Sequence, residues 1–195
     1  LNEIQLRDIK TSFSPDLSGD PIGEKLTTKP NILVILAESV PGSFVHSVAP
    51  ESLRDPIHSV ESVSRLSKEG LVYKNFLAVN RQTNRGEYSL LCGKFPNFIQ
   101  NSAKMDSYRG TEGGHDECLP SYLSRNGYTT HYIQSAPLAF MGKDRFMDYA
   151  GFDFVAGENM FDDAYMWRGW GVDDRTSFEG TIKHIDELEK KFFHW

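Results

Sequence analysis

The sequence lacks the patterns that mark several protein classes. No run of apolar residues approaches the roughly 18 that a transmembrane helix needs, and no signal peptide is visible. Acidic residues (27) outnumber lysine and arginine (21), and this net charge of −6 argues against a nucleic-acid-binding surface. None of the six histidines forms an HxH or HExxH pattern, and CxxC pairs and zinc-finger spacings are also missing.

The composition is that of a folded globular protein. Hydrophobic residues make up 39% and charged residues 25% of the chain, and 195 residues suffice for one sizeable domain. We expect residues 1–29, which are polar and contain proline and glycine, to be a lead-in or linker segment. We expect residues 30–195 to belong to a folded domain, and we expect the chain to be a fragment of a longer protein, because it begins without methionine.

The chain contains two cysteines, Cys92 and Cys118. In a reducing compartment they would be free thiols. In an oxidising compartment they could form a disulfide that closes a loop of about 25 residues, which would stabilise the fold by roughly 3 kcal/mol. The sequence leaves both alternatives open.

Four segments have the composition of β-strands. The continuous aliphatic run at 31–37 is typical of a central parallel strand that is buried on both faces, and it ends at Glu38. The segments 71–79 and 128–134 alternate apolar and polar residues, and 192–195 resembles the first half of a further strand. A carboxylate such as Glu38 at the carboxyl end of a buried strand lies where open α/β sheets bind ligands.

Helical spacing of apolar residues separates these strands. It predicts helices over 56–70, from 87–91 onward, over 119–126 and over 178–188, whereas 140–170 reads as irregular and rich in aromatic residues. Because predicted strands alternate with predicted helices, we expect an α/β fold with a mostly parallel central sheet flanked by helices.

Three residues near the predicted strand ends could carry chemistry. Glu38 is either a ligand for a hard cation or a solvated carboxylate. Thr83 follows the strand predicted at 71–79, and it is either a metal-activated nucleophile or a helix N-cap. Arg85 either pairs with a phosphoryl or sulfuryl oxygen or lies on the surface.

Other polar and aromatic residues have simpler interpretations. We expect His184 to be solvated, because it lies opposite the apolar stripe of its predicted helix, and His131 to be packed or exposed within its strand. Asp173 or Asp174 is expected to cap the helix that follows. Trp170 could line a substrate cleft or serve in packing.

Five segments in order resemble the alkaline-phosphatase/sulfatase superfamily, in particular its lipoteichoic acid synthase-like (phosphoglycerol transferase) group. "KPNILVILAES" resembles the opening strand, in the version with Glu at the metal position, and "NRQTNRGEYSLLCGKFP" resembles the nucleophile segment. The later blocks "LPSYLSRNGYTTHYIQSA", "FMGKDRFMDYAGFDFV" and "WGVDDRTSFEGTIKHIDEL" follow in the same order. The resemblance covers about residues 29–195.

The resemblance assigns roles to individual residues. Glu38 would be a ligand of a divalent cation, Mn²⁺ or Mg²⁺ foremost, with Zn²⁺ or Ca²⁺ as alternatives, and Thr83 would be both ligand and nucleophile. Where well-known members have a Trp and an Arg against the substrate headgroup, this chain has Met141 and Lys143, so its substrate could differ. The remaining metal ligands, an Asp-His pair, are expected beyond Trp195, and we expect the isolated chain to be inactive.

The resemblance also implies a function. We expect a transferase that moves a phosphoglycerol-type group from a membrane lipid to a glycan or polymer acceptor, on the extracytoplasmic side of a membrane to which a segment outside this chain anchors it. Alternatives are a phosphoethanolamine transferase, a sulfatase or phosphodiesterase-type hydrolase, and a non-catalytic module that binds the cell envelope. The sulfatase reading is the weaker one, because Thr83 stands where that chemistry needs a Cys or Ser.

Overall fold

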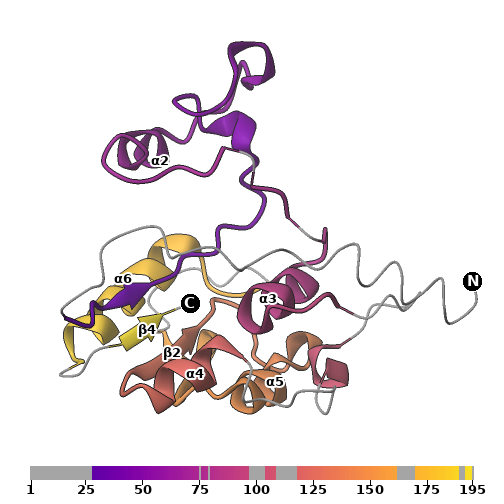
Figure 1. Ribbon diagram of the computed structural model, residues 1–195, viewed down its shortest axis with the longest axis vertical. Coiled ribbons are helices and arrows are strands. Elements are labelled where there is room, and N and C mark those ends of the chain that lie inside the picture. The colour runs from indigo at the N-terminus through magenta and orange to yellow at the C-terminus, as the bar shows by residue number, and fades with distance from the viewer. Residues whose placement is uncertain are drawn as a thin grey trace, which may run out of the picture.

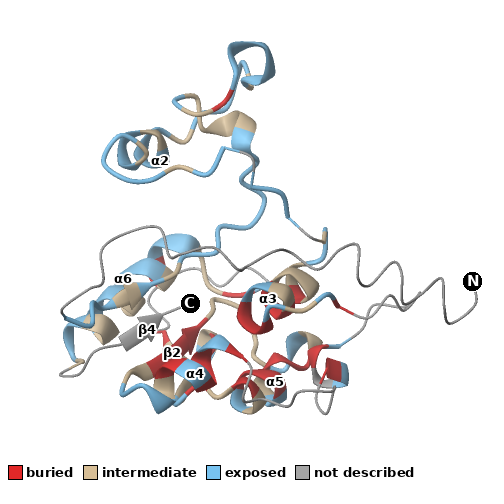
Figure 2. Cartoon of the chain, viewed as in Figure 1, coloured by how far each residue is buried: buried red, intermediate tan, exposed pale blue. Residues whose placement is uncertain are grey.

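A computed structural model describes residues 28–74, 76–78, 80–96, 104–108, 118–161, 170–188 and 192–194. The ribbon consists of an α/β body and an arm that projects from it, formed by the segment between the first strand and helix α3 (Figure 1). Buried residues are concentrated in the body, whereas the arm is largely exposed (Figure 2).

The body is built on a four-stranded parallel sheet with the order β1-β4-β2-β3. Its strands are β1 (Ile32–Leu33), β2 (Thr129–Ile133), β3 (Phe154–Ala156) and β4 (Phe192–His194). All three pairings are parallel, and His131 of β2 lies opposite both Phe154 and His194. The predicted α/β class with a parallel sheet is confirmed.

Strand β1 differs from the prediction of a central strand buried on both faces. Only Ile32 and Leu33 are in strand conformation, and β4 is the only described strand that pairs with them. Leu33 is 52% and Ile35 61% exposed, so the side chains of this aliphatic segment are not buried on both faces.

Helices cover both faces of β2. Because side chains alternate along a strand, Tyr132 and His131 point to opposite faces. Tyr132 contacts side chains of α3 and α5, whereas His131 contacts His184 of α6. The helices on the Tyr132 side are α3 (Thr83–Cys92), α4 (Leu119–Arg125) and α5 (Lys143–Ala150), and the helix on the other side is α6 (Asp174–Asp186).

The main core lies on the Tyr132 side, between the sheet and helices α3 to α5. Its centre is aromatic: the rings of Tyr88 and Tyr108 stack at 4.2 Å, and Phe146 meets both edge-on. Burial of such large apolar side chains is the dominant stabilising contribution to a fold of this kind. The buried members are Tyr88, Leu91, Cys92, Met105, Tyr108, Cys118, Leu123, Tyr132, Phe146, Met147, Ala150 and Phe152.

Several predicted elements need correction. The helix predicted at 56–70 is shorter, since α2 spans only Glu61–Leu66, and α3 begins at Thr83 rather than at Glu87. The segment 71–79, predicted as a strand, has no strand among its described residues. No strand of the sheet pairs with these described residues. The segment 140–170, predicted as irregular, contains α5 and β3.

Helix α5 was missed although its sequence carries a helical pattern. Phe146, Met147 and Ala150 have the spacing of one helix face and are completely buried, and Gly151 ends the helix at φ 92°. By contrast, α4, β2 and the strand at β4 were predicted correctly.

The arm is held together by its own hydrogen bonds. It includes the 3₁₀ turns Gly42–Phe44 and Glu51–Leu53 and helix α2. The Asp55 amide donates to the Ser43 carbonyl (3.1 Å), and the Val60 amide donates to the Phe44 carbonyl (2.9 Å). Many of its apolar side chains, such as Leu53, Ile57 and Leu66, are exposed, and none of its residues belongs to the main core.

Helix α6 begins as predicted, at an aspartate cap. The Asp173 carboxylate accepts hydrogen bonds from the amide (3.1 Å) and the hydroxyl (2.7 Å) of Thr176. These hydrogen bonds to the charged form lower the pKa of Asp173. The predicted apolar stripe of α6, however, does not face the sheet: Phe178 is 52% and Ile182 54% exposed.

The face of α6 that packs on the sheet uses smaller and polar residues. Gly180 lies against the Phe161 ring so closely that an added Cβ would come within 2.6 Å of it. His184 stacks on Phe154 (4.7 Å between ring centroids), and its Nε2 is 3.0 Å from Nδ1 of His131. The prediction that His184 is solvated is therefore wrong.

The His131–His184 pair predicts a dependence of stability on pH. Burial lowers the pKa of both histidines, and the neighbouring His184 lowers that of His131 further. Because both pKa values are lower in the folded state, stability is fully present above the unfolded pKa of about 6.5 and is lost as pH falls below it. Urea denaturation from pH 7.5 to 5 measures this loss, and His184→Gln should flatten the profile. A wild-type profile no steeper than that of the variant would contradict the assignment.

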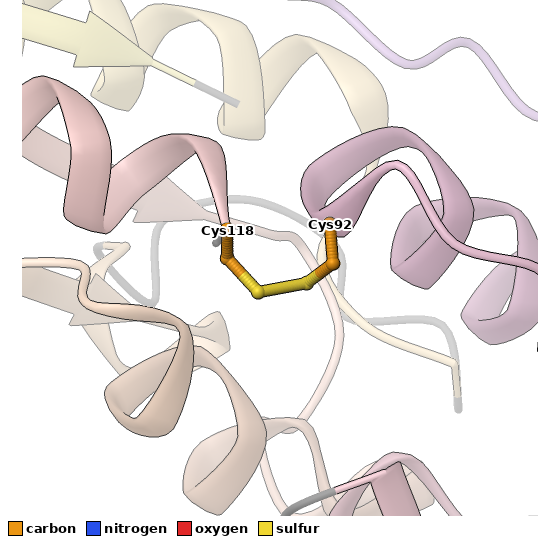
Figure 3. The surroundings of a disulfide bond; sticks show 2 residues. All are labelled: Cys92 and Cys118. Carbon is orange, nitrogen blue, oxygen red and sulfur yellow. A yellow bond between two sulfur atoms is a disulfide. The ribbon is translucent and has the colours of Figure 1, made fainter. Parts of the chain in front are cut away.

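A disulfide joins Cys92, at the end of α3, to Cys118, immediately before α4 (Figure 3). Both residues belong to the buried core, and the bond closes a loop across a sequence separation of 26. Of the two alternatives that the sequence left open, the structure has the disulfide.

Removing this bond should destabilise the body without changing its packing. We expect the double variant Cys92→Ser/Cys118→Ser to lose about 3 kcal/mol of unfolding free energy, since the cross-link restricts the unfolded chain. Urea denaturation of the oxidised protein, the reduced protein and the variant measures the effect. Two titratable thiols in protein secreted to an oxidising compartment would contradict the bond.

Candidate active site

Three segments meet at the carboxyl ends of the parallel strands. Glu38 lies five residues after β1, Thr83 is the first residue of α3, and residues 134–136 directly follow β2. This edge of an open α/β sheet is where ligands bind, because loops and helix N-termini converge there.

A cavity of about 600 Å³ opens at this edge. Both residues that were predicted to bind metal, Glu38 and Thr83, line it, and so do all three that were predicted to bind substrate, Met141, Lys143 and Trp170. The remaining lining residues are Arg81, Gln82, Asn84, Gln134, Ser135, Ala136 and Phe140. Residues that are up to 132 positions apart in the sequence therefore surround one cavity.

A second cavity of about 450 Å³ adjoins the first. It lies between the segment 33–40 and helix α6, and it shares Glu38, Thr83 and Lys143 with the first cavity. Both cavities thus converge on the same small group of polar residues.

Thr83 occupies a position suited to contact with an anion. It is half-buried at the N-terminus of the ten-residue helix α3, and Gln82, the N-cap residue, makes no side-chain capping hydrogen bond. The N-terminus of a helix carries partial positive charge and amide donors, so a phosphoryl or sulfuryl group next to Thr83 would be stabilised there. The alternative interpretation of Thr83 as the N-cap is wrong, because it lies one position inside the helix.

Lys143 forms a buried ion pair beneath the cavity. Its Nζ donates to Oε1 of Glu87 at 2.8 Å and to the Tyr132 hydroxyl at 3.3 Å. The side chains of Lys143 and Glu87 are only 10% and 4% exposed. The ammonium that was predicted to neutralise a substrate phosphate is thus anchored by a carboxylate one helical turn after Thr83.

The ion pair belongs to a wider hydrogen-bond network. The Tyr132 hydroxyl lies 3.2 Å from Oε1 of Glu87 and 2.7 Å from Oε1 of Gln134, whose amide in turn donates to the carbonyls of Ala136 and Pro137. The network connects α3, β2 and the loop after β2, so it fixes the floor of the cavity.

Burial dominates the electrostatics of this network. Burial raises the pKa of Glu87, and the charge of Glu38 adds a smaller increase. The charge and hydrogen bond of Lys143 and the hydrogen bond from Tyr132 lower that pKa. Burial, followed by the neighbouring Glu87 carboxylate, raises the pKa of Tyr132 well above its ordinary value, so its phenol stays protonated.

Arg85 does not join the other predicted site residues. Arg85 lines neither cavity. It lies close to Tyr108 instead: burial raises the pKa of the Tyr108 phenol, and the positive charge of Arg85 lowers that pKa in part. Since α3 begins at Thr83, Arg85 lies two positions along the helix, about 200° around its axis. Its predicted role against a phosphoryl oxygen has no support in this arrangement.

Trp170 and Met141 lie at the aromatic side of the cavity. The Trp170 ring meets Phe140 edge-on, with centroids 5.8 Å apart and an interplanar angle of 88°. Met141 adopts φ 61°, a left-handed conformation that is uncommon outside glycine, and Gly142 continues it at φ 71°. This tight turn places Phe140, Met141 and Lys143 on one cavity wall.

The oxygen ligands Glu38 and Thr83 suit a hard divalent cation. Within the described part of the chain, no group of three His, Cys, Asp or Glu side chains is arranged to hold a metal ion. Two protein oxygens are fewer than the about six ligands that Mg²⁺ or Mn²⁺ prefers. The chemistry of these two residues therefore fits a cation, but further ligands must come from elsewhere.

Sequence reasoning missed three of the residues that shape the cavity: Glu87, Arg81 and Gln134. Glu87 could have been found, because it stands four residues after Thr83 on the same helix. Arg81 immediately precedes the N-cap of that helix, and Gln134 immediately follows β2. Neither has a pattern that separates it from an ordinary loop residue.

Comparison with known proteins identifies related sequences. The sulfatase family model matches residues 30–195. Phosphoglycerol transferase I of Escherichia coli O127:H6 is 26% identical over 168 residues, which is 83% of this chain and 21% of that protein. The same enzyme of Shigella boydii serotype 18 has equal identity and coverage. The chain thus spans about a fifth of the length of the curated relatives it matches.

Solved structures share the fold. The lipoteichoic acid synthase LtaP from Listeria monocytogenes superimposes with a TM-score of 0.66 at 19% identity, over 85% of this chain and 39% of that one. A protein of the alkaline phosphatase superfamily from Vibrio parahaemolyticus gives 0.68 at 22% identity, over 87% and 40%. Together with the family match over residues 30–195, this confirms the predicted resemblance to the superfamily.

The buried ion pair should contribute strongly to stability. We expect Glu87→Ala to cost about 3–5 kcal/mol of unfolding free energy, because it leaves the Lys143 ammonium buried without a counter-charge. The double variant Glu87→Met/Lys143→Met should recover most of this loss. Urea denaturation of the wild type and both variants checks it. The control is Glu179→Ala, which removes an exposed ion pair on α6 between Glu179 and Arg175. A Glu87→Ala cost no larger than that of Glu179→Ala would refute the pair's role.

Proposed function

Because this chain belongs to the sulfatase family, we propose that its cavity is part of the catalytic centre of a transferase. The enzyme moves a phosphoglycerol-type group from a membrane lipid to an acceptor in the cell envelope. The observation that carries this proposal is the meeting of Glu38, Thr83 and Lys143 at one cavity on the carboxyl edge of the sheet. The relatives named phosphoglycerol transferase I support the reaction class.

The reaction proceeds in two displacement steps at phosphorus. The Thr83 hydroxyl oxygen forms a bond to the lipid phosphorus and loses its proton. The bond from phosphorus to the diacylglycerol oxygen breaks, and that oxygen takes up a proton. An acceptor hydroxyl then forms a bond to the same phosphorus and loses its proton. The bond to Thr83 breaks, and the Thr83 oxygen takes up a proton. Each step replaces one phosphorus–oxygen bond with another, so no oxidant or reductant is needed.

The chain's own residues position and stabilise the reacting group. The amide groups at the start of α3 face the anionic group beside Thr83, and Lys143 adds a fixed positive charge that Glu87 and Tyr132 hold in place. A divalent cation at Glu38 and Thr83 would supply charge that favours the threonine alkoxide.

The disulfide supports an extracytoplasmic location for the domain. The Cys92–Cys118 disulfide fits an oxidising environment, so we place the domain on the extracytoplasmic side of a membrane. Among the described residues, no helix has both the length and the apolar character that a membrane crossing requires. We propose that a segment outside this chain anchors the domain to the membrane.

A covalent adduct on Thr83 tests the function directly. Incubation of the full-length protein with a membrane lipid extract and Mn²⁺, followed by peptide mass spectrometry, should find phosphoglycerol on Thr83. Thr83→Ala should abolish the adduct and reduce transfer by about 10³-fold or more, while Thr83→Ser should keep measurable activity because it retains the hydroxyl. EDTA should abolish adduct formation.

The mass of the adduct separates the alternatives. A phosphoethanolamine adduct would replace the proposed donor, and a sulfate adduct or release of free product without an acceptor would point to a hydrolase. Full transfer by Thr83→Ala would rule out the nucleophile. A folded full-length protein with neither bound metal nor adduct would instead indicate a non-catalytic envelope-binding module.

A further inference from the structure

Two arginines flank Thr83 at equal distances along the chain, and they differ in whether they reach the cavity. Arg81, two residues before Thr83, lines the cavity that contains it, whereas Arg85, two residues after it, lines neither cavity. A phosphoryl group that is transferred to Thr83 carries negative charge on its non-bridging oxygens, and positively charged donors stabilise this charge. The cavity offers Arg81, and not Arg85, for this purpose.

The backbone on the two sides of Thr83 explains this difference. Gln82, between Arg81 and Thr83, has an extended backbone (φ −86°, ψ 128°), and side chains two positions apart project to the same side of an extended segment. From Thr83 onward the chain is helical, so residues two positions apart are separated by about 200° around the helix axis. The change from extended to helical backbone therefore directs Arg81 to the side of Thr83 and turns Arg85 away from it.

The positive charge of Arg81 is not engaged within the described part of the chain. Two cationic side chains line this cavity, Arg81 and Lys143, and the Lys143 ammonium is held by the Glu87 carboxylate at 2.8 Å. Arg81 is exposed, and no described residue forms an ion pair with it. Its planar guanidinium can donate two parallel hydrogen bonds to a pair of phosphoryl oxygens, a geometry that the Lys143 ammonium lacks.

We propose that Arg81 is a catalytic residue that binds the non-bridging oxygens of the phosphoryl group while the group moves from the lipid to Thr83. This inference rests on the proposed function and adds to it a residue that contacts the reacting group. Arg81 takes the role that the sequence suggested for Arg85. Lys143 and the amides at the start of α3 act on the group from the two helices, and Arg81 acts on it from the loop before α3.

The rate of adduct formation on Thr83 in the full-length protein measures this role. Arg81→Ala should slow the adduct about 10²- to 10³-fold, which is the usual effect of removing one donor to a charge that develops during the reaction. Arg81→Lys should recover only part of the rate, because an ammonium lacks the planar fork. Arg85→Ala is the matched control, since it removes the same type of side chain at the same sequence distance from Thr83, and its rate should stay within about twofold of the wild type.

Two further measurements separate a direct contact from structural support. Millimolar guanidinium ion should restore part of the rate of Arg81→Ala and leave that of Arg85→Ala unchanged, because the added ion can replace only a guanidinium that contacts the reacting group. Titration calorimetry of the full-length protein with glycerol phosphate should show about tenfold weaker binding in Arg81→Ala than in the wild type. Urea denaturation of each variant verifies that it is folded.

The outcomes distinguish this inference from the proposed function. Adduct formation by Arg81→Ala at the wild-type rate, an equal loss in Arg85→Ala, no rescue by guanidinium or unchanged affinity for glycerol phosphate would overturn the role of Arg81. Absence of the adduct in the wild type, with binding of glycerol phosphate that depends on Arg81, would overturn the proposed transfer and leave Arg81 as a phosphate-binding residue.

Discussion

The buried pair of Glu87 and Lys143 is the interaction on which the cavity depends. It joins the helix that begins with Thr83 to the helix that begins with Lys143, and Tyr132 connects both to the central strand β2. Two charges removed from water are tolerated only when they are paired and hydrogen-bonded, so neither helix can shift without leaving a buried charge unpaired. The position of Thr83 relative to the sheet follows from this constraint.

Parallel strand pairing supplies the second constraint. Because β1, β4, β2 and β3 all run in the same direction, the segments that follow β1 and β2 emerge at one edge. Glu38 and Gln134 lie on these segments and meet Thr83 there. The disulfide between Cys92 and Cys118 ties the far end of α3 to α4, so the same helix is held at both ends.

The body and its surroundings differ in how well they are packed. Tyr88, Leu91 and Phe146 are almost completely buried between the sheet and helices α3 to α5. By contrast, Ile35, Phe178 and Leu66 of the arm remain exposed, although their sequence patterns are those of packed elements. A sequence pattern indicates that a residue favours burial, but the residue is buried only where another part of the protein packs against it.

The sequence by itself determined the α/β class, the strands at 129–133 and 192–194 and the helix at 119–125, because local periodicity encodes these elements. Short motifs carried the resemblance that singled out Glu38, Thr83, Met141 and Lys143. Tertiary structure alone decided that Lys143 pairs with Glu87, that Arg85 turns toward Tyr108, and that His184 meets His131. Such pairings join residues from different elements, and one sequence contains no signal for contacts between elements. The physical reason is that the direction of a side chain depends on where its helix begins and which face its neighbours cover.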